Sequence, residues 1–280
     1  MPYFLNFNMK NKLKISIVTV TFNCASVIED TLKSVIGQSY SNLEYTIIDG
    51  SSTDNTLNIV NVHSEKIAKI ISEPDKGIFD AMNKALRYVT GDYVLFLNAG
   101  DRFVNNHVVA DVFEGKDYSA DLIYGDTYIE TVYGYKLSKA NAIYDKNPSA
   151  IDMVFVAQGF CHQSLFTKVS VLKNIGFNLA YPLGADYDTT AKIYFQGNHE
   201  LFYVGFPIAV FDDRQGGASH NRIKQVLDER IMMFNPRKSV VFYWQYCKTI
   251  MAERVKSLMA LCVPKIVERV RKRKYINSIE

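Results

Sequence analysis

The chain has 280 residues, of which 48% are hydrophobic and 22% are charged, as in a globular protein with one large or two small domains. The stretch 246–274 holds nine Lys and Arg against two Glu, a net charge of +7; since the whole chain carries +3, the remainder is −4. An acidic body with a basic tail argues against a general nucleic-acid-binding protein, so we expect no nucleic acid as a partner. Four cysteines without a CxxC spacing argue against a disulfide framework or a zinc site.

The sequence lacks the usual signals of secretion and membrane insertion. Its first residues, "MPYFLNFNMKNK", are too short and too polar for a signal peptide. No apolar run reaches the roughly 18–20 residues that cross a bilayer. Together with the dispersed cysteines, these features predict a cytoplasmic protein.

Short apolar strands alternate with helices over residues 15–97. Strands are expected at 15–21, 43–49, 67–72 and 93–97. Helices are expected at 25–37, after the turn "GSSTDNT", and at 78–90. This alternation predicts an α/β protein with a mostly parallel, Rossmann-like sheet flanked by helices. No Gly-x-Gly-x-x-Gly follows the first strand, so a dinucleotide-binding fingerprint is absent.

The pattern changes after residue 101. Further strands are expected at 121–130, 133–137, 201–204 and 207–211, as a mixed extension of the sheet. Helices are expected at 169–175, at 185–195 and from 221 onward, with Pro264 as the first residue of a last helix. The stretch 140–155 has the composition of a loop.

Aspartates follow three successive predicted strands. Asp49, Asp75 and Asp101 stand at or just after strand ends, and the carboxyl ends of parallel strands share the sheet edge where ligands bind. A single aspartate of this kind is usually a turn or cap residue. Three carboxylates at one edge repel one another, so they need a cation or a donor-rich ligand between them. The pattern predicts a ligand site at this edge.

Four motifs occur in order: "ISIVTVTFN", "IIDGSSTDNT", "EPDKGIFDAMNKAL" and "GDYVLFLNAGD". This ordered set resembles the inverting family 2 glycosyltransferases with the GT-A fold, most of all bacterial enzymes that build surface polysaccharides. The resemblance covers about residues 14–211. It implies a GT-A catalytic domain at 12–220, with a nucleotide-binding half at 12–101 and an acceptor half at 102–220. A C-terminal helical extension would follow at 221–280.

The resemblance also implies roles on the donor side. The nucleotide would be bound by Thr21, Phe22, Asn23, Asp49, Asp75, Lys76, Gly77, Asn83, Asn98 and Asp101. Thr21 and Phe22 would flank the base, and Asp49 would accept a base N–H. Asp101 would bind Mg²⁺ or Mn²⁺ as the last acid of the family's acidic motif, while Asn98 offers only a neutral oxygen.

On the acceptor side, "PLGADYDTTAKIYFQG" resembles the family's acidic motif at the start of a helix. It implies that Asp186 is the catalytic base that takes a proton from the acceptor hydroxyl, with Asp188 as the competing candidate. A first-turn carboxylate also suits the helix dipole, so a capping role is compatible. His162, Gln163 and Arg214 are either structural residues or contacts to the diphosphate or the acceptor.

The C-terminal stretch places apolar residues at helical spacing with Lys and Arg between them: Met251, Val255, Leu258, Met259 and Cys262. Such a helix either packs on the catalytic domain with a solvated basic face or lies against anionic headgroups. The basic run 269–274 favours peripheral contact with an anionic membrane, at the inner face of the cell membrane.

We therefore expect an inverting glycosyltransferase of polysaccharide biosynthesis. It would move a sugar from a nucleotide-diphosphate donor, UDP-linked by resemblance, to a glycan or lipid-linked acceptor. One alternative is a catalytically weak, nucleotide-sugar-binding scaffold, which the reduced acidic motif allows. Another is a sugar-phosphate nucleotidyltransferase, which needs a Gly-rich basic loop where this chain has "TFNCASVIED".

Overall fold

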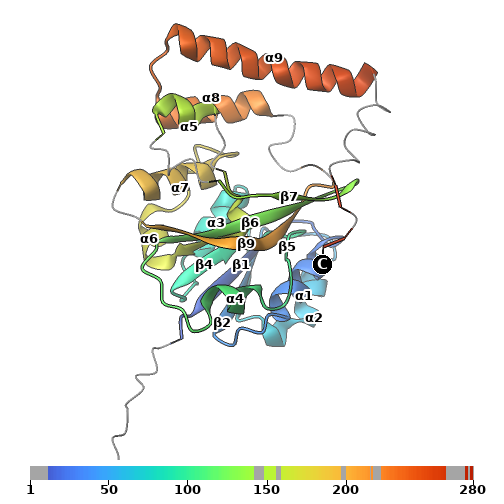
Figure 1. Ribbon diagram of the computed structural model, residues 1–280. Helices are drawn as coiled ribbons and strands as arrows, with labels where there is room; N and C mark the ends of the chain where they lie inside the picture. Colours follow the sequence, from blue (N-terminus) through green and yellow to red (C-terminus); the bar gives the residue numbers. More distant parts are fainter. Residues whose placement is uncertain are drawn as a thin grey trace, which may run out of the picture.

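A computed structural model describes residues 12–141, 148–155, 159–196, 200–214, 216, 222–262, 275–276 and 278–279. A single sheet forms its centre, and helices cover both faces (Figure 1). The helices on one face are α1 (Ile28–Ile36), α2 (Thr56–Val62) and α4 (Val108–Phe113). The helices on the other face are α3 (Ile78–Ala85), α6 (Val169–Ile175) and α7 (Ala185–Phe195).

The sheet has a parallel half and a mixed half, as predicted. Its strand order is β3-β2-β1-β4-β8-β6-β9-β5, with β7 paired to β6. The strands are β1 (Ile15–Thr21), β2 (Leu43–Asp49), β3 (Lys69–Ser72), β4 (Tyr93–Phe96), β5 (Arg102–Phe103), β6 (Leu122–Thr131), β7 (Gly134–Ser138), β8 (Leu165–Lys168) and β9 (Leu201–Asp212). Strands β1 to β4 pair in parallel, so their carboxyl ends meet at one edge. Strand β8 runs antiparallel between β4 and β6 and begins the mixed half.

Strand β1 shows how the sequence builds both layers. All seven of its residues are buried. Ile15 and Ile17 join the core cluster with α1, α2 and α4, whereas Val18 and Val20 join the cluster with α3 and α6. A strand buried on both faces must be apolar at nearly every position, which explains the unbroken apolar run in the sequence.

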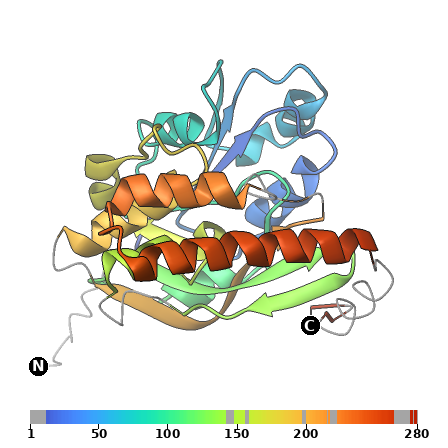
Figure 2. The same cartoon turned by 90° about the horizontal axis from the view of Figure 1, so that it is seen from above.

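A further helical layer lies beyond α7, formed by α5 (Ala150–Phe155), α8 (Ile223–Phe234) and α9 (Val240–Cys262) (Figures 1 and 2). Helices α8 and α9 lie side by side, as the view from above shows (Figure 2). The rings of Phe155 and Phe242 join α5 to α9 at a centroid distance of 5.5 Å, and those of Tyr187 and Phe234 join α7 to α8 at 5.7 Å. Among the described residues, none of the helices combines the length and apolar character needed to cross a bilayer.

Several predicted elements differ from the structure. The stretch expected to be a loop at 140–155 contains α5, and the two strands expected after residue 200 are the single strand β9. Strand β9 continues past Gly205 and Pro207 because its register against β6 shifts between Tyr124 and Asp126, and a β-bulge absorbs such a break. Strand β8 was not predicted, since a buried strand of four residues has no readable period. The predicted helix after Pro264 and the basic run 269–274 lie outside the described residues.

Candidate functional site

The carboxyl ends of β1, β2 and β3 meet around the fully buried Asp49. Its Oδ1 accepts hydrogen bonds from the hydroxyls of Thr21, at 3.0 Å, and Ser52, at 2.5 Å. Its Oδ2 accepts from the Ser52 N–H at 2.9 Å and the Ser72 hydroxyl at 2.7 Å. Four donors therefore occupy the four lone-pair directions of this carboxylate.

These hydrogen bonds keep Asp49 ionised. Burial alone would raise its pKa, but the hydrogen bonds from Ser52, Ser72 and Thr21 outweigh burial and hold the pKa below its ordinary value. Asp49 thus ties three strand ends together. Its predicted contact to a base N–H stays a prediction, and it requires one of these bonds to open.

Beside Asp49, the Asp75 carboxylate and the Phe22 ring lie over Gly50. The Phe22 ring is 63% exposed. A Cβ placed on Gly50 would lie 2.4 Å from Asp75 Oδ2 and 3.4 Å from Phe22 Cδ2, so no side chain fits there without a shift. The Asp75 Oδ1 accepts the Gly77 N–H at 2.8 Å. An exposed ring can stack on a base, and the neighbouring carboxylate can accept a base N–H.

Asn23 and Asn83 hold the surrounding turns. Asn23 has a φ of 47°, and its Oδ1 accepts the Thr53 N–H at 2.8 Å. The Asn83 amide bonds both backbone groups of Phe177, donating to its C=O and accepting from its N–H, each at 2.8 Å. Asn83 therefore joins α3 to the chain after α6, while the Lys76 side chain is exposed. Their predicted nucleotide contacts stay predictions.

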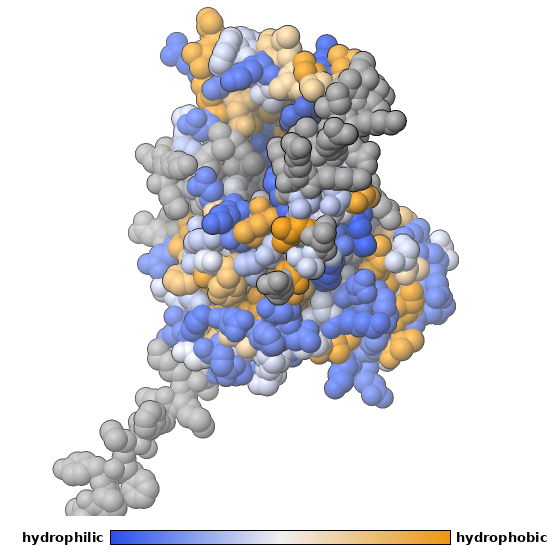
Figure 3. Space-filling model, turned by 45° about the vertical axis from the view of Figure 1, so that its right-hand side comes forward, coloured by the Kyte–Doolittle hydropathy of each residue, from blue (hydrophilic) through white to orange (hydrophobic). Residues whose placement is uncertain are grey.

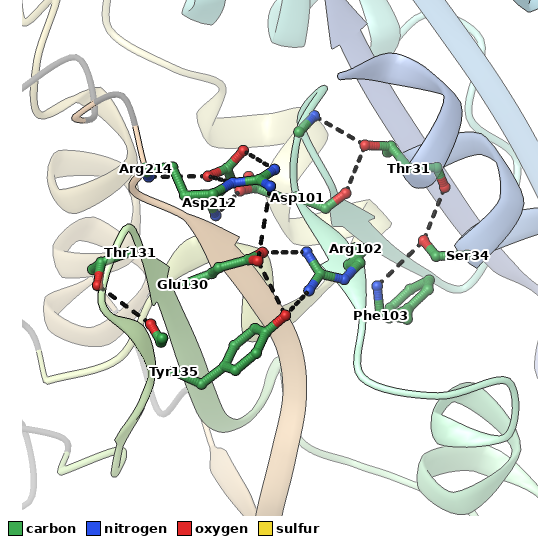
Figure 4. Close-up of polar contacts among 12 residues, drawn as sticks. Thr31, Ser34, Asp101, Arg102, Phe103, Glu130, Thr131, Tyr135, Asp212 and Arg214 are labelled. Carbon is green, nitrogen blue, oxygen red and sulfur yellow. Dashed lines mark hydrogen bonds and ion pairs between the residues drawn. The ribbon is translucent and has the colours of Figure 1, made fainter. Parts of the chain in front are cut away.

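Asp101 lies within a buried polar network (Figure 4). Its Oδ1 accepts the Asp212 N–H at 2.9 Å, and its Oδ2 accepts from Gln163 Nε2 at 3.1 Å. The preceding Gly100, at a φ of 100°, donates its N–H to Thr31 Oγ1, and the Thr31 hydroxyl donates to the Asp101 C=O. Burial raises the pKa of Asp101 to about 6. A cation beside this carboxylate would favour its ionised form.

Asn98 supplies a second oxygen at the same edge. Its Oδ1 is buried and has no hydrogen-bond partner among the described residues, while its Nδ2 lies 3.0 Å from His162 Nε2. Mg²⁺ and Mn²⁺ accept one carboxylate and a neutral oxygen, with phosphate and water completing the shell. Asn98 and Asp101 fit such an ion, although the described ranges hold no cluster of three or more His, Cys, Asp or Glu side chains suited to a metal.

His162 connects this edge to α7. Its Nδ1 lies 3.4 Å from Asp186 Oδ2, so one imidazole ring stands between Asp186 and Asn98. Burial alone would lower the pKa of His162, but the hydrogen bond and charge of Asp186, together with Asp101, raise it. Asp188 is buried and paired with Lys192 Nζ at 2.6 Å. The geometry thus favours Asp186 over Asp188 as the carboxylate open to a ligand.

Arg214 is engaged with acids next to the site. Its Nη2 lies 2.8 Å from Asp212 Oδ2, and its Nη1 lies 3.8 Å from Glu130 Oε1. Glu130 in turn pairs with Arg102 at 2.6 Å and accepts the Tyr135 hydroxyl at 3.0 Å, as Figure 4 shows. Arg214 therefore supports the strand that binds Asp101, and its predicted contact to the leaving diphosphate stays a prediction.

A cleft of about 1260 Å³ joins this edge to the helical layer. Five predicted site residues line it: Asn98, Asp101, His162, Gln163 and Asp186. The base-side residues lie outside its lining. Ile78 and Phe79, which directly follow Gly77, do line it, so the segment 75–79 runs from Asp75, beside Phe22, to the cleft.

Sequence reasoning missed Asp212 and Glu229. The Asp212 backbone N–H binds Asp101, a role that depends on the strand and not on the side-chain type. Glu229 on α8 is buried, and its Oε2 accepts the Leu183 N–H at 3.0 Å just before α7 begins. A single Glu within an amphipathic helix carries no sequence signal. Only the packing of α8 against α7 reveals it.

A largely parallel α/β sheet whose carboxyl edge opens into a cleft is the architecture of transferases with the GT-A fold. The chain belongs to Glycosyl transferase family 2, whose sequence model matches residues 16–171. It is 29% identical over 224 residues to a PGL/p-HBAD biosynthesis glycosyltransferase of Mycobacterium bovis, covering 78% of this chain and 84% of that protein. It is 32% identical over 117 residues to the UDP-Glc:alpha-D-GlcNAc-diphosphoundecaprenol beta-1,3-glucosyltransferase WfaP of Escherichia coli, covering 41% and 47%.

Two solved structures share the fold. S. aureus TarS 1–349 in complex with UDP-GlcNAc gives a TM-score of 0.58 at 18% identity, covering 79% of this chain and 67% of that one. The mannosyltransferase PcManGT of Pyrobaculum calidifontis, in complex with GDP-Man and Mn²⁺, gives 0.54 at 18% identity, covering 94% and 84%. The predicted family and GT-A fold are confirmed, and the protein is a glycosyltransferase of glycan biosynthesis. Family membership argues against the nucleotidyltransferase alternative.

Proposed function

We propose that this protein transfers a sugar from a UDP-sugar to a glycan or lipid-linked acceptor with inversion at the anomeric carbon. The observation that carries the proposal is the His162 ring, which contacts Asp186 on one side and Asn98 on the other. Asp186 and the proposed cation ligands Asn98 and Asp101 thus line one cleft, with the His162 imidazole between Asp186 and Asn98. Direct displacement needs this pair: a base at the attacking hydroxyl and positive charge at the leaving diphosphate.

The chain's own residues divide this work. Asp186 takes the proton of the acceptor hydroxyl as its oxygen attacks the sugar, while His162 orients the Asp186 carboxylate. Asp101 and Asn98 would hold Mg²⁺ or Mn²⁺, which when bound supplies positive charge for the diphosphate. Gln163 and the Asp212 N–H fix Asp101 in place. Apolar side chains such as Phe160 and Leu183 also line the cleft beside these polar groups.

On the base side, Asp75 is the better placed acceptor for a uracil N–H. Asp49 already accepts four hydrogen bonds, whereas Asp75 accepts one from Gly77 and lies beside the exposed Phe22 ring. We assign Phe22 to stacking on the base and Asp75 to accepting a hydrogen bond from it. Asp49 holds together the ends of the strands that precede both residues. The segment 75–79 then guides the diphosphate toward Asp101.

The outward face of α9 supports peripheral contact with a membrane. Trp244, Met251 and Val255 lie on one side of this helix at helical spacing, each more than half exposed. Lys248 flanks them with its Nζ 4.9 Å from the Trp244 ring. Apolar (orange) and hydrophilic (blue) side chains intermix over this uppermost layer (Figure 3). An apolar stripe flanked by cations suits the boundary of an anionic bilayer, and the proposed place of action is its cytoplasmic face.

A donor screen tests the proposed function. Calorimetry with UDP, GDP and their sugars, with and without Mn²⁺, should give Mn²⁺-dependent binding of a UDP-sugar, and that donor should release UDP on addition of a lipid-linked acceptor. Tight binding with no turnover on any acceptor would instead favour the scaffold alternative. Preference for GDP would contradict the assignment of the base.

A further inference from the structure

The two walls of the cleft differ in charge. The sheet side presents Asp101, Asp186 and Asp212. The opposite wall, from α8 and α9, presents four cations: Arg222, Lys224, Arg230 and Arg254. Glu253 is the acid that α9 adds to this lining. Under the proposed function the donor diphosphate would lie at the acidic wall with its cation, and the cationic wall would then face the acceptor side of the transferred sugar.

Three of these cations are not engaged by acids of the chain. Within the ranges that the structure describes, Arg222, Lys224 and Arg254 form no ion pair. All three are exposed, and exposed cations that line one cleft attract an anionic ligand. The wall is therefore accessible to an anion.

The cationic wall is joined to α7, the helix that carries the candidate base. Arg230 lies over the ring of Tyr187, with its guanidinium carbon 4.6 Å from the ring centroid, and Tyr187 directly follows Asp186. Glu229, the residue before Arg230, accepts the Leu183 N–H and fixes α8 to the start of α7. An anion on this wall would share the cleft with a hydroxyl positioned for Asp186.

The same wall is also apolar. Ile223, Val226, Ile250 and Leu258 alternate with the cations in the lining. Leu258 is 58% exposed as well, so the apolar lining continues onto the outside of α9, where Met251 and Val255 are exposed. Cations interleaved with apolar side chains fit a phosphate attached to a hydrocarbon chain better than a free anion.

We propose that the α8–α9 wall is the acceptor subsite and that it binds the phosphate or diphosphate of a lipid-linked acceptor, with the hydrocarbon chain leaving along α9. This inference rests on the proposed function for the place of the donor. It adds the chemical class of the acceptor and the residues that recognise it.

Geranyl diphosphate, a short soluble prenyl diphosphate, is the probe. It is titrated into the full chain with saturating UDP and Mn²⁺, which keep the probe out of the donor site. We expect it to bind, and to bind more tightly than inorganic pyrophosphate because of the apolar lining. The double variant Lys224→Gln and Arg254→Gln should weaken the binding at least tenfold, since one lost charge-assisted contact is worth roughly that factor. The matched control is the double variant Lys66→Gln and Lys136→Gln, which removes two exposed lysines outside the cleft lining and should bind as the wild type does.

Three results would overturn the proposal: displacement of geranyl diphosphate by UDP, wild-type affinity in the double variant, or equal affinity for pyrophosphate. Failure of the proposed function is seen separately, because UDP binding is measured on the same proteins without the probe. A variant that keeps its UDP affinity and melting temperature but loses the probe has lost the acceptor subsite alone.

Discussion

Replacing Asp49 by Asn tests whether this carboxylate supports the fold or reads the base. The substitution turns one oxygen, which accepts two hydrogen bonds, into an NH₂ group that faces two donors. Hydrogen bonds to a charged group contribute about 1.5–3 kcal/mol each, and rotation of the hydroxyls recovers part of the loss. We expect the free energy of unfolding to fall by about 2–4 kcal/mol, measured by urea denaturation at pH 7.

The pH dependence gives a second check on Asp49. Its pKa in the folded protein lies below the ordinary value of 3.8, because the hydrogen bonds to the charged form outweigh burial. The stabilisation is therefore present above about pH 4 and is lost as the pH falls through the folded pKa. Asn does not titrate, so the gap between wild type and Asp49→Asn should narrow below pH 4.

Asp75→Asn is the matched control. Asp75 accepts a single backbone hydrogen bond from Gly77, so its substitution should change the free energy of unfolding by less than about 1 kcal/mol while weakening UDP binding. If Asp49→Asn unfolds like the wild type but loses UDP, and Asp75→Asn binds UDP normally, Asp49 reads the base and our assignment is wrong.

Three further predictions concern the cation edge, α8 and α9. Burial raises the pKa of Asp101 to about 6, so the Mn²⁺-dependent binding of UDP should weaken about tenfold per pH unit below 6. In calorimetry, Asp101→Asn should abolish the Mn²⁺ dependence of UDP binding. Equal binding of UDP by the wild type in chelator would contradict this. Glu229→Ala removes the hydrogen bond that holds the start of α7, so turnover should fall about tenfold or more at unchanged donor affinity. Asp228→Ala, at an exposed acid of α8, should leave both turnover and donor affinity unchanged. The double variant Trp244→Ser and Met251→Ser should reduce sedimentation of the protein with anionic vesicles, whereas Val62→Ser, at an exposed apolar position of α2, should not. If the full-length wild type does not sediment with such vesicles at low salt, α9 instead packs on the catalytic domain without binding a membrane.

The parallel half of the fold was readable because its strands are buried on both faces. The bounds of β1 and β2 match the prediction, since an unbroken β-branched run between turn residues has few alternative structures. The mixed half was less readable. Strand β8 has four residues, and β9 contains Gly205 and Pro207, so local sequence suggested breaks that pairing with β6 overrides.

The candidate site shows a similar division. The motifs indicated Asp101 and Asp186, and the fold brings both to one cleft. The roles of Asp49 and Asn83 depend on how many donors and acceptors already bind them, which no sequence pattern encodes. The cationic wall was also hidden, because its members come from two helices and meet only through tertiary packing.

The role of Asp186 as the general base is tested most directly by the rate of sugar transfer. Asp186→Asn keeps the shape and removes the basicity, so the rate of sugar transfer should fall by about 10²–10⁴-fold while UDP-sugar affinity stays near that of the wild type. Asp188→Asn breaks an ion pair with Lys192 and should transfer within a few-fold of the wild-type rate. An active Asp186→Asn beside an inactive Asp188→Asn would contradict the account.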